Sequence, residues 1–296
     1  MIDEHLEQAY NVRMVTPGSA EKVSALANRA EQARIRMAQA GITRSEERYG
    51  PGARETVDIF APKDAGNDVT ARPCLLFIHG GYWRSLTKED YAWVAEPYLA
   101  HGWVVAIVEY ALVPDVTIAQ ITDQIGRAFA WITDPQHSAR LKIAADGVTV
   151  VGHSAGGHLA LAALVMDRSS GQSSAGRPQA RQIVCISGVF DLAPLLHTSM
   201  NADLRLHAKA ADALSPMHHV HTVPMPICIA AGDQEPTGFI DQHTDFLNAL
   251  AERDVPTVER IDLAGADHFD ACDRLVDTDG ELFNSITRHG WRATPA

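Results

Sequence analysis

The sequence lacks the features that mark membrane, secreted and nucleic-acid-binding proteins. No apolar run approaches the roughly 18 residues that a membrane-spanning helix needs. The first ten residues, MIDEHLEQAY, are acidic and have no apolar core, so we expect no secretory signal. Basic residues are too few to attract polyanions: 25 Lys and Arg against 37 Asp and Glu give a net charge of −12. We therefore expect neither nucleic acid nor a membrane surface as a partner.

Cysteine is also scarce, and its placement argues against disulfides and metal centres. The four cysteines are scattered, form no C-x-x-C pair, and in three cases lie in apolar strand-like runs. Such a pattern predicts a reduced, cytoplasmic protein. The cluster His218-His219-x-His221 has no nearby cysteine and no i, i+4 spacing, so we assign it no metal. No G-x-G-x-x-G or Walker loop follows a predicted strand, and we predict no cofactor.

What the chain does contain is the composition of a folded globular domain. Hydrophobic residues make up 46% and charged residues 21% of the 296 positions. This length suits one large α/β domain, and we predict a single domain over residues 1–296. Residues 1–45 read as a helical N-terminal arm, and residues 188–222 as a small cap insertion. The expected partner is a small-molecule substrate, and a homodimer is left open.

Strand-like and helix-like segments alternate along the chain, which predicts a mostly parallel central sheet of about eight strands with helices on both faces. The polar stretch 167–181, DRSSGQSSAGRPQAR, reads as a surface loop. The predicted strands are two short ones within 46–60, then 74–78, 103–108, 148–151, 183–187, 227–231 and 256–261. The predicted helices are 19–40, 88–100, 117–133, the segment after residue 154, 239–253 and 271–289.

The most informative stretch is 148–163, VTVVGHSAGGHLALAA. A β-branched run enters a sharp turn, Gly152-His153-Ser154-Ala155-Gly156, and a helix follows. This is the G-x-S-x-G nucleophile elbow in its required context of strand, tight turn and helix. The turn exposes the serine oxygen, and the helix N-terminus directs free N–H groups at an oxyanion beside it. The alternative is a glycine-rich turn with a capping serine.

Ser154 needs a base, and the base needs an orienting acid. In this fold both follow later strands, in the order serine, acid, histidine. His268 lies in the loop after the last predicted strand and is the expected base. The loop after residues 227–231 offers two acids, Asp233 and Glu235. The spacing Gly-x-x-acid favours Glu235, with Asp233 as the alternative.

The oxyanion hole requires two preorganised N–H donors. Ala155, directly after the nucleophile, is expected to supply one. The sequence His79-Gly80-Gly81-Tyr82-Trp83 follows a predicted strand, and we expect the second donor at Gly81, assisted by Tyr82. Tyr82, Trp83 and His153 are the predicted substrate contacts, although the two aromatic side chains could equally belong to the core.

These motifs together resemble the kynurenine formamidase (arylformamidase) branch of the α/β hydrolases. The resemblance rests on His79-Gly-Gly-Tyr-Trp83, Glu109-Tyr-Ala-Leu-Val-Pro114 and Gly152-His-Ser-Ala-Gly-Gly-His-Leu-Ala160. It extends to Tyr10-Asn11-x-Arg13, to Phe239 and Gln242, and to Asp267-His268-Phe269, and so covers nearly the whole chain. The family acid is usually Asp, whereas this chain has Glu235 at that place.

The resemblance implies an α/β-hydrolase fold, with Ser154 as nucleophile, His268 as base and Glu235 as acid. It implies a cofactor-free serine hydrolase that cleaves a small amide or ester, with an aryl or N-formyl amide as the first expectation. A carboxylesterase without formamidase activity is the alternative. A non-catalytic ligand-binding protein on a hydrolase scaffold is a remote third, because Ser154 and His268 are both present.

Overall fold

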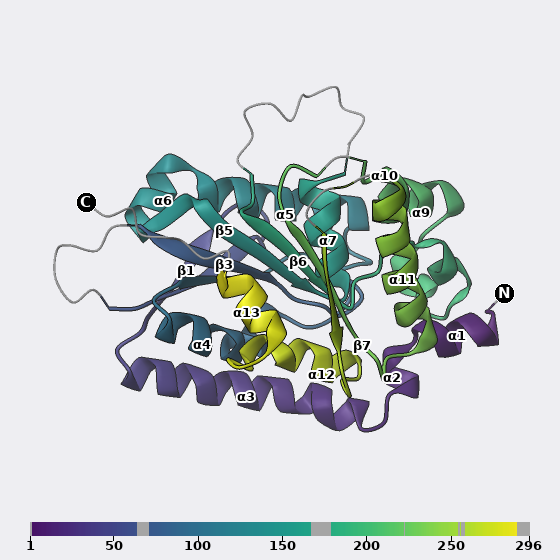
Figure 1. Cartoon of the computed structure of the whole chain (residues 1–296), viewed down its shortest axis with the longest axis horizontal. Helices are drawn as coiled ribbons and strands as arrows, with labels where there is room; N and C mark the ends of the chain where they lie inside the picture. Colours follow the sequence, from purple (N-terminus) through teal and green to yellow (C-terminus); the bar gives the residue numbers. More distant parts are fainter. Residues whose placement is uncertain are drawn as a thin grey trace.

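The computed structural model describes residues 2–63, 71–166, 179–221, 223–253, 255 and 258–288. It is a three-layer structure, with one sheet between two layers of helices (Figure 1). The predicted loop 167–181 lies, apart from its last residues, outside the described residues. Within the described residues, no helix combines the length and the apolar character needed to cross a membrane.

The sheet has eight strands in the order β1-β2-β4-β3-β5-β6-β7-β8. The β1–β2 and β2–β4 pairs are antiparallel, and the other neighbours are parallel. The number and mostly parallel arrangement of the strands confirm the predicted fold class. The strands are β1 (Thr43–Arg48), β2 (Thr56–Ala61), β3 (Arg72–Ile78), β4 (Val104–Val108), β5 (Ile143–His153), β6 (Gln182–Ile186), β7 (Ile227–Gly232) and β8 (Val258–Leu263).

Each face of the sheet is covered by its own group of helices. One apolar core joins the sheet to α5 (Ile118–Thr133), α7 (Ala155–Leu164) and α11 (Thr237–Glu252). The other joins it to α3 (Ser19–Gln39), α4 (Ala95–Ala100), α12 (His268–Asp273) and α13 (Glu281–Arg288). The strands β3 to β7 are buried almost throughout, because both of their faces are covered.

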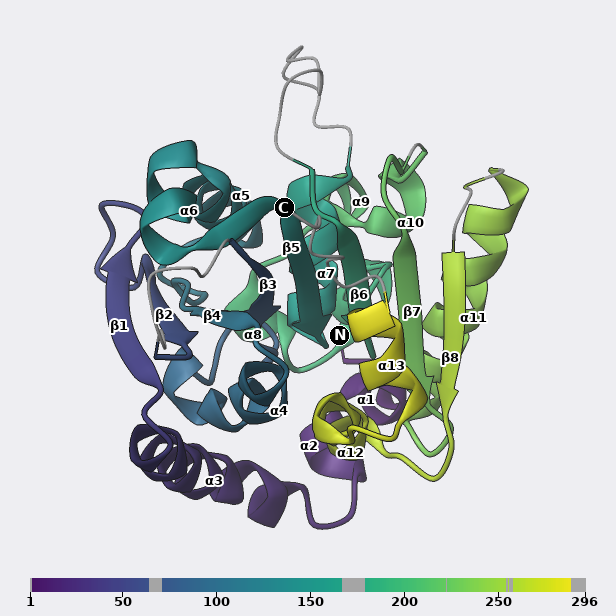
Figure 2. The ribbon, with the colours of Figure 1, turned by 60° about the vertical axis from the view of Figure 1, so that its left-hand side comes forward.

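The remaining helices are short. They are α1 (Glu4–Tyr10), α2 (Val12–Val15), α6 (Pro135–Leu141), α8 (Asn201–Leu204), α9 (Ala208–Leu214) and α10 (Pro216–His219), with 3-10 turns η1 (Lys88–Asp90), η2 (Ala92–Val94), η3 (Ala193–His197) and η4 (Arg274–Val276). Figure 2 shows the parallel strands pointing toward α2, α3 and α12, so the N-terminal arm crosses the edge at which these strands end. Parallel α/β sheets bind their ligands at this edge.

Two predicted helices are wrong in extent. The helix expected over 88–100 is two 3-10 turns followed by the short α4, because a Thr87–Asp90 capping box and long-range bonds of Lys88 hold the first turn. The helix expected over 271–289 begins earlier, at His268, where Asp267 caps it. It is interrupted by Asp277-Thr-Asp-Gly280 and resumes as α13. Asp and Gly favour turns over helix interiors.

The turn between β5 and α7 depends on a close approach of backbones. A methyl group at Gly156 would lie 2.0 Å from the carbonyl oxygen of Ile78. A methyl at Gly152 would lie 2.2 Å from the Gly156 carbonyl oxygen. Neither contact involves a flexible side chain, so the backbone itself would have to move. The helix α7 can pack this closely on the sheet only with glycine at both positions.

This packing predicts opposite effects for two Gly→Ala changes inside helices. Gly156→Ala in α7 should destabilise the protein by at least about 2 kcal/mol, because a buried backbone must shift. Gly126→Ala in α5, where nothing lies within 4 Å of the new methyl, should stabilise it by about 0.5–1 kcal/mol. Urea unfolding measures both. Equal effects of the two changes would contradict the packing argument.

Candidate active site

Ser154 occupies the turn between β5 and α7 in a conformation that few non-glycine residues adopt. Its φ is 56° and its ψ is −121°. Its backbone N–H donates to the carbonyl of Ile186 at 2.8 Å, and its own carbonyl accepts from Gly157 at 2.9 Å. These bonds from a neighbouring strand and from the helix hold the strained residue in place, as is common at functional sites. The hydroxyl is thereby presented at the edge where the strands end.

His268 lies within hydrogen-bonding distance of this hydroxyl. Its Nε2 is 3.1 Å from Ser154 Oγ, and its Nδ1 is 2.7 Å from Glu235 Oε2. All three side chains are buried, with exposed fractions of 3%, 2% and 6% for Ser154, His268 and Glu235. The three residues come from the ends of β5, β7 and β8, far apart in sequence. The structure therefore brings the expected nucleophile, base and acid together in one chain of contacts.

Glu235 keeps its charge although it is buried. Burial raises the pKa of its carboxyl group, but hydrogen bonds from His268, from the Ser187 hydroxyl (2.6 Å) and from the Gly232 N–H (2.7 Å) outweigh this effect. The pKa of Glu235 therefore lies below its ordinary value. A carboxylate here orients His268, so that Nδ1–H donates to it and Nε2 faces Ser154 with its lone pair.

The alternative acid, Asp233, lies elsewhere. It is exposed, and its Oδ1 accepts a hydrogen bond from the Gly265 N–H at 2.7 Å. This bond ties together the loops after β7 and β8. Of the two carboxylates in this loop, the structure thus places Glu235, and not Asp233, against His268.

The residues predicted as oxyanion donors belong to two segments that lie beside Ser154. Ala155 is the first residue of α7, where a backbone N–H has no intrahelical acceptor. The opposite loop passes directly over the nucleophile, since a methyl at Gly80 would lie 3.0 Å from Ser154 Cβ. Gly81 follows with a φ of 112°, and its carbonyl accepts from the N–H groups of Arg84 and Ser85, both at 3.1 Å. This tight turn fixes the loop beside Ser154.

A small cavity of about 40 Å³ lies beside Ser154 and His268. Gly81 and Tyr82 line it on one side, and Asn11, Val12, Arg13, Val23 and Leu26 cover it from the N-terminal arm. A second cavity, of about 150 Å³, shares Leu26, Tyr91, His153 and Phe269 with the first. The arm therefore forms part of the wall of the site, whereas no residue of the predicted cap, within its described part 188–221, lines either cavity.

The three residues predicted to contact the substrate differ in whether they line the cavities. Tyr82 lines the small cavity, and its hydroxyl donates to the carbonyl of Tyr10. His153 lines both cavities, and its Nε2–H donates to the His268 carbonyl at 2.9 Å. Trp83 is fully buried in the core with its ring 5.0 Å from that of His158, and it lines neither cavity. The prediction of Trp83 as a substrate contact is therefore wrong: its ring serves the core.

In the cluster His218-His219-x-His221, the rings of His218 and His219 lie 6.2 Å apart and each has a partner in the protein. His218 Nε2 lies 3.8 Å from an Asp191 carboxylate oxygen, and His219 Nε2–H donates to the Asp212 carbonyl at 2.9 Å. Among the described residues, one group has the geometry of metal ligands: Glu46, Asp58 and Glu89. The Lys88 ammonium lies 2.7–3.0 Å from all three carboxylates, which explains how three acids can lie together.

Comparison with known proteins agrees with this geometry. The BD-FAE family model matches residues 57–250. Kynurenine formamidase of Salmo salar is 31% identical over 79% of this chain and 77% of its own length. The chain belongs to the BD-FAE family and to the kynurenine formamidase-like branch of the α/β hydrolases. It is an enzyme that hydrolyses amide or ester bonds.

Two further similarities are to an esterase and to a solved structure. Esterase LipQ of Mycobacterium tuberculosis is 28% identical over 74% of this chain and 55% of its own length. A Silicibacter protein, provisionally named a thioesterase, has a solved structure with a TM-score of 0.78 and 29% identity, covering 95% of this chain and 98% of its own. The fold of nearly the whole chain is thus also that of this solved structure.

The structure also adds Ser187, which the motifs did not indicate, and shows the place of Phe239, which the family resemblance included without a role. Ser187, at the end of β6, has a φ of 53° and donates its hydroxyl to Glu235. The Phe239 ring lies 4.4 Å from the His268 ring and limits its rotation. Ser187 follows a predicted strand, but a single serine carries no sequence signal. Its role becomes visible only when β6 and β7 are placed side by side.

His153 predicts an effect of pH on stability. Burial, and then the neighbouring charge of His268, lower the pKa of His153 to about 3. In the unfolded chain this histidine binds a proton below about pH 6.5, whereas in the fold it stays neutral. Its contribution to stability is therefore complete above pH 6.5 and is lost as the pH falls toward 3.

Between about pH 7.5 and pH 5, the free energy of unfolding of the wild type should fall by about 2 kcal/mol more than that of His153→Gln. Urea unfolding of both proteins at the two pH values measures this difference. Because only the change with pH is compared, the result does not depend on how far the substitution lowers the free energy of unfolding at neutral pH. Identical losses in the two proteins would show that His153 is not the group that is held neutral.

Proposed function

We propose that the chain is a cofactor-free serine hydrolase of the arylformamidase type, which removes a formyl or similarly small acyl group from an aromatic amine. The observation that carries the proposal is the continuous contact from Ser154 Oγ to His268 Nε2 and from His268 Nδ1 to Glu235. A serine hydroxyl in this arrangement is activated because the imidazole accepts its proton and the carboxylate stabilises the imidazolium.

The reaction then follows from the positions of these groups. Ser154 Oγ attacks the substrate carbonyl carbon while its proton moves to His268 Nε2. The N–H groups of Ala155 and Gly81 stabilise the negative charge on the carbonyl oxygen. His268 returns the proton to the leaving amine as the carbon–nitrogen bond breaks. Water, deprotonated by the same histidine, hydrolyses the acyl-enzyme and regenerates Ser154.

The two cavities favour a small acyl group and an aromatic leaving group. The cavity of about 40 Å³ next to Ser154 has room for little more than one water-sized group. Its neighbour of about 150 Å³ has a size that holds a benzene ring in other proteins, and its walls include Tyr91, Trp93 and Phe269. A formyl group on an aryl amine matches both volumes, and long acyl chains match neither.

A carboxylesterase that acts on small esters is the second candidate. It is supported by the similarity to esterase LipQ, and it uses the same three side chains. The two candidates differ in the bond that is cleaved, and a non-catalytic ligand-binding protein would cleave neither.

The assignment of the acid predicts unequal effects of two neighbouring substitutions. Glu235→Gln should lower kcat by about 10²–10⁴-fold, because the amide can no longer stabilise the imidazolium. Asp233→Asn should change kcat by less than about threefold, since the exposed Asp233 carboxylate accepts from the Gly265 N–H and the Gln234 side chain and does not contact His268. The kcat of Ser154→Ala gives the background rate with which both variants are compared. A larger loss in Asp233→Asn than in Glu235→Gln would reverse the assignment.

The substrate assignment is tested by kcat/KM for N-formyl-L-kynurenine and for p-nitrophenyl acetate. We expect about 10⁴ M⁻¹s⁻¹ or more for the formamide, which lies in the ordinary range of enzymes on their own substrates. Butyrate and longer esters of p-nitrophenol should be poorer than the acetate, because of the small acyl cavity. Activity on the acetate without any on the formamide would retain the mechanism and leave the carboxylesterase as the function.

A further inference from the structure

Glu109 is a buried carboxylate that lies outside the catalytic triad. It follows β4 directly and is 6% exposed. Its Oε1 lies 2.5 Å from Arg54 Nη2 and accepts from the Tyr110 N–H at 3.1 Å, and its Oε2 accepts from the Lys88 N–H at 3.0 Å. Burial raises the pKa of the Glu109 carboxyl group, but the neighbouring His79 ring and these hydrogen bonds outweigh burial, so the pKa lies below its ordinary value. Glu109 is therefore a negative charge held in one place.

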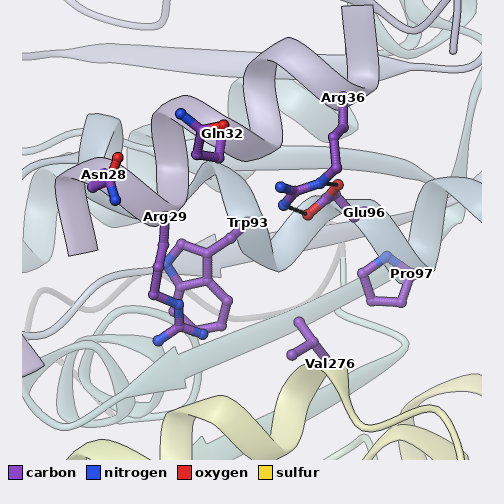
Figure 3. A pocket seen from close by; sticks show the side chains of 8 residues that line it. All are labelled: Asn28, Arg29, Gln32, Arg36, Trp93, Glu96, Pro97 and Val276. Carbon is purple, nitrogen blue, oxygen red and sulfur yellow. Dashed lines mark hydrogen bonds and ion pairs between the residues drawn. The ribbon is translucent and has the colours of Figure 1, made fainter. Parts of the chain in front are cut away.

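An ordinary ion pair of this protein has a different setting. Figure 3 shows the pair of Arg36 and Glu96, at the wall of the wide cavity of about 660 Å³ between α3 and α4. Two parallel hydrogen bonds of 2.8 Å join the guanidinium to the carboxylate. Neither side chain lines a cavity beside Ser154. Glu96 is thus the partner of an arginine at the surface, whereas Glu109 also faces a histidine of the loop that passes over Ser154.

This histidine is His79, and both of its ring nitrogens face acceptors. The ring is fully buried and stacks on the Tyr110 ring, with centroids 4.2 Å apart and an angle of 12° between the planes. Its Nε2 lies 3.6 Å from Glu109 Oε1 and, among the described residues, has no hydrogen-bond partner. Its Nδ1 lies 2.8 Å from the Gly80 carbonyl oxygen. Because a carbonyl oxygen only accepts, Nδ1 carries a hydrogen and donates to it.

The Gly80 carbonyl belongs to the peptide unit that also carries the Gly81 N–H. The C=O and N–H of a trans peptide point in opposite directions, and this peptide bond is trans. The carbonyl is turned toward the His79 ring and toward the Tyr110 hydroxyl, which lies at 3.4 Å. The Gly81 N–H is therefore turned away from these buried side chains. Gly81 lines the cavity beside Ser154, and neither His79 nor Tyr110 does. Among the described residues this N–H has no acceptor, so it is free to bind an oxyanion.

We propose that Glu109 is a positioning residue for the oxyanion hole, and that it acts through His79 on the peptide unit of Gly80 and Gly81. The inference rests on the serine mechanism of the proposed function, because that mechanism forms an oxyanion beside Ser154. A hydrogen on each nitrogen of His79 satisfies both the carbonyl at Nδ1 and the carboxylate at Nε2. The carboxylate thereby keeps Nδ1–H directed at the Gly80 carbonyl and attracts positive charge into the ring. Hydrogen bonds in a chain polarise one another, so the Gly81 N–H becomes a stronger donor to the substrate oxyanion.

Three substitutions separate the steps of this chain of contacts. Glu109→Gln keeps the size of the side chain and removes its charge. His79→Asn keeps a donor near the place of Nδ1 and removes Nε2, so it breaks the link to Glu109. Glu55→Gln is the matched control, because Glu55 is also a buried carboxylate, 5% exposed, that pairs with an arginine. Its carboxylate bonds with Arg127 at 2.9 Å and with the Gly52 N–H at 3.3 Å, and these partners do not belong to the loop over Ser154.

The readout is the ratio of kcat/KM for phenyl acetate to kcat/KM for O-phenyl thionoacetate, in which sulfur replaces the carbonyl oxygen. Sulfur accepts hydrogen bonds weakly, so the thionoester gains little from the oxyanion donors and the ratio measures their strength. Loss of one oxyanion donor lowers turnover by about 10²–10³-fold. Glu109→Gln weakens such a donor without removing it, and should lower the ratio by about tenfold. Glu55→Gln should keep the wild-type ratio.

A double-mutant cycle shows whether Glu109 acts through His79. His79→Asn should lower the ratio about as far as Glu109→Gln does. In the His79→Asn background, Glu109→Gln should lower it by less than about twofold further, because the link is already broken. A full further loss would mean that Glu109 acts by another path, and this overturns the inference. A ratio that stays at the wild-type value in Glu109→Gln overturns it as well.

Structural damage gives a different result. Equal losses on the ester and the thionoester would mean that Glu109 only supports the fold, which also overturns the inference. Where circular dichroism shows that Glu109→Gln does not fold, the two variants His79→Asn and His79→Gln decide. His79→Gln loses the donor at Nδ1 and should lower the ratio further than His79→Asn. The wild-type ratio in both variants would overturn the inference.

The same esters separate this inference from the proposed function. If the protein cleaves phenyl acetate but no formamide, and the ratio falls as expected, the formamidase proposal fails and the role of Glu109 stands. If Ser154→Ala cleaves phenyl acetate as fast as the wild type, the serine mechanism fails and this inference fails with it.

Discussion

The contact between Glu235 and His268 is the interaction on which the rest of the site depends. A buried carboxylate is costly unless it is paired and hydrogen-bonded, and here three groups satisfy it: the His268 ring, the Ser187 hydroxyl and the Gly232 N–H. Because these groups come from different strands, the sheet must be complete before the pair can form. The orientation of His268, and through it the availability of Ser154, follows from the assembled sheet and not from any local motif.

The N-terminal arm contacts two of the segments that hold the site together. Lys22 on α3 pairs at 2.6 Å with both Asp267 and Asp270, which flank His268 at the start of α12. The same arm contacts the loop over Ser154 through Arg13 and through the Tyr10 carbonyl. One segment thus touches both the base-bearing helix and the oxyanion loop. Its side chains also line the cavity beside Ser154.

The structural features that were predicted best are those that local sequence patterns determine. The elbow around Ser154, the number of strands and the helix α3 were predicted from glycine placement and from apolar periodicity, and the structure has them. The bounds of β1 (Thr43–Arg48) and β5 (Ile143–His153) were not, since β1 is polar and mostly exposed and begins inside the segment 1–45 that was predicted as a helical arm. The spacing Gly-x-x-acid indicated Glu235, and the structure places that residue against His268. The predictions that failed concern residues whose partners lie far away in the sequence. The 3-10 turn at Lys88 is held by Asp58, and the Trp83 ring packs against His158. The contribution of Ser187 and the position of Glu109 beside His79 are likewise properties of the assembled fold.

The central claim is that Ser154 is a nucleophile activated by His268, and covalent labelling tests it most directly. The native protein would be treated with a fluorophosphonate, and the modified peptide would be located by mass spectrometry. The account predicts a single adduct on Ser154, formed rapidly in the wild type and at least about a hundredfold more slowly in His268→Ala. An adduct on another residue, or labelling of Ser154 at the same rate without His268, would contradict it.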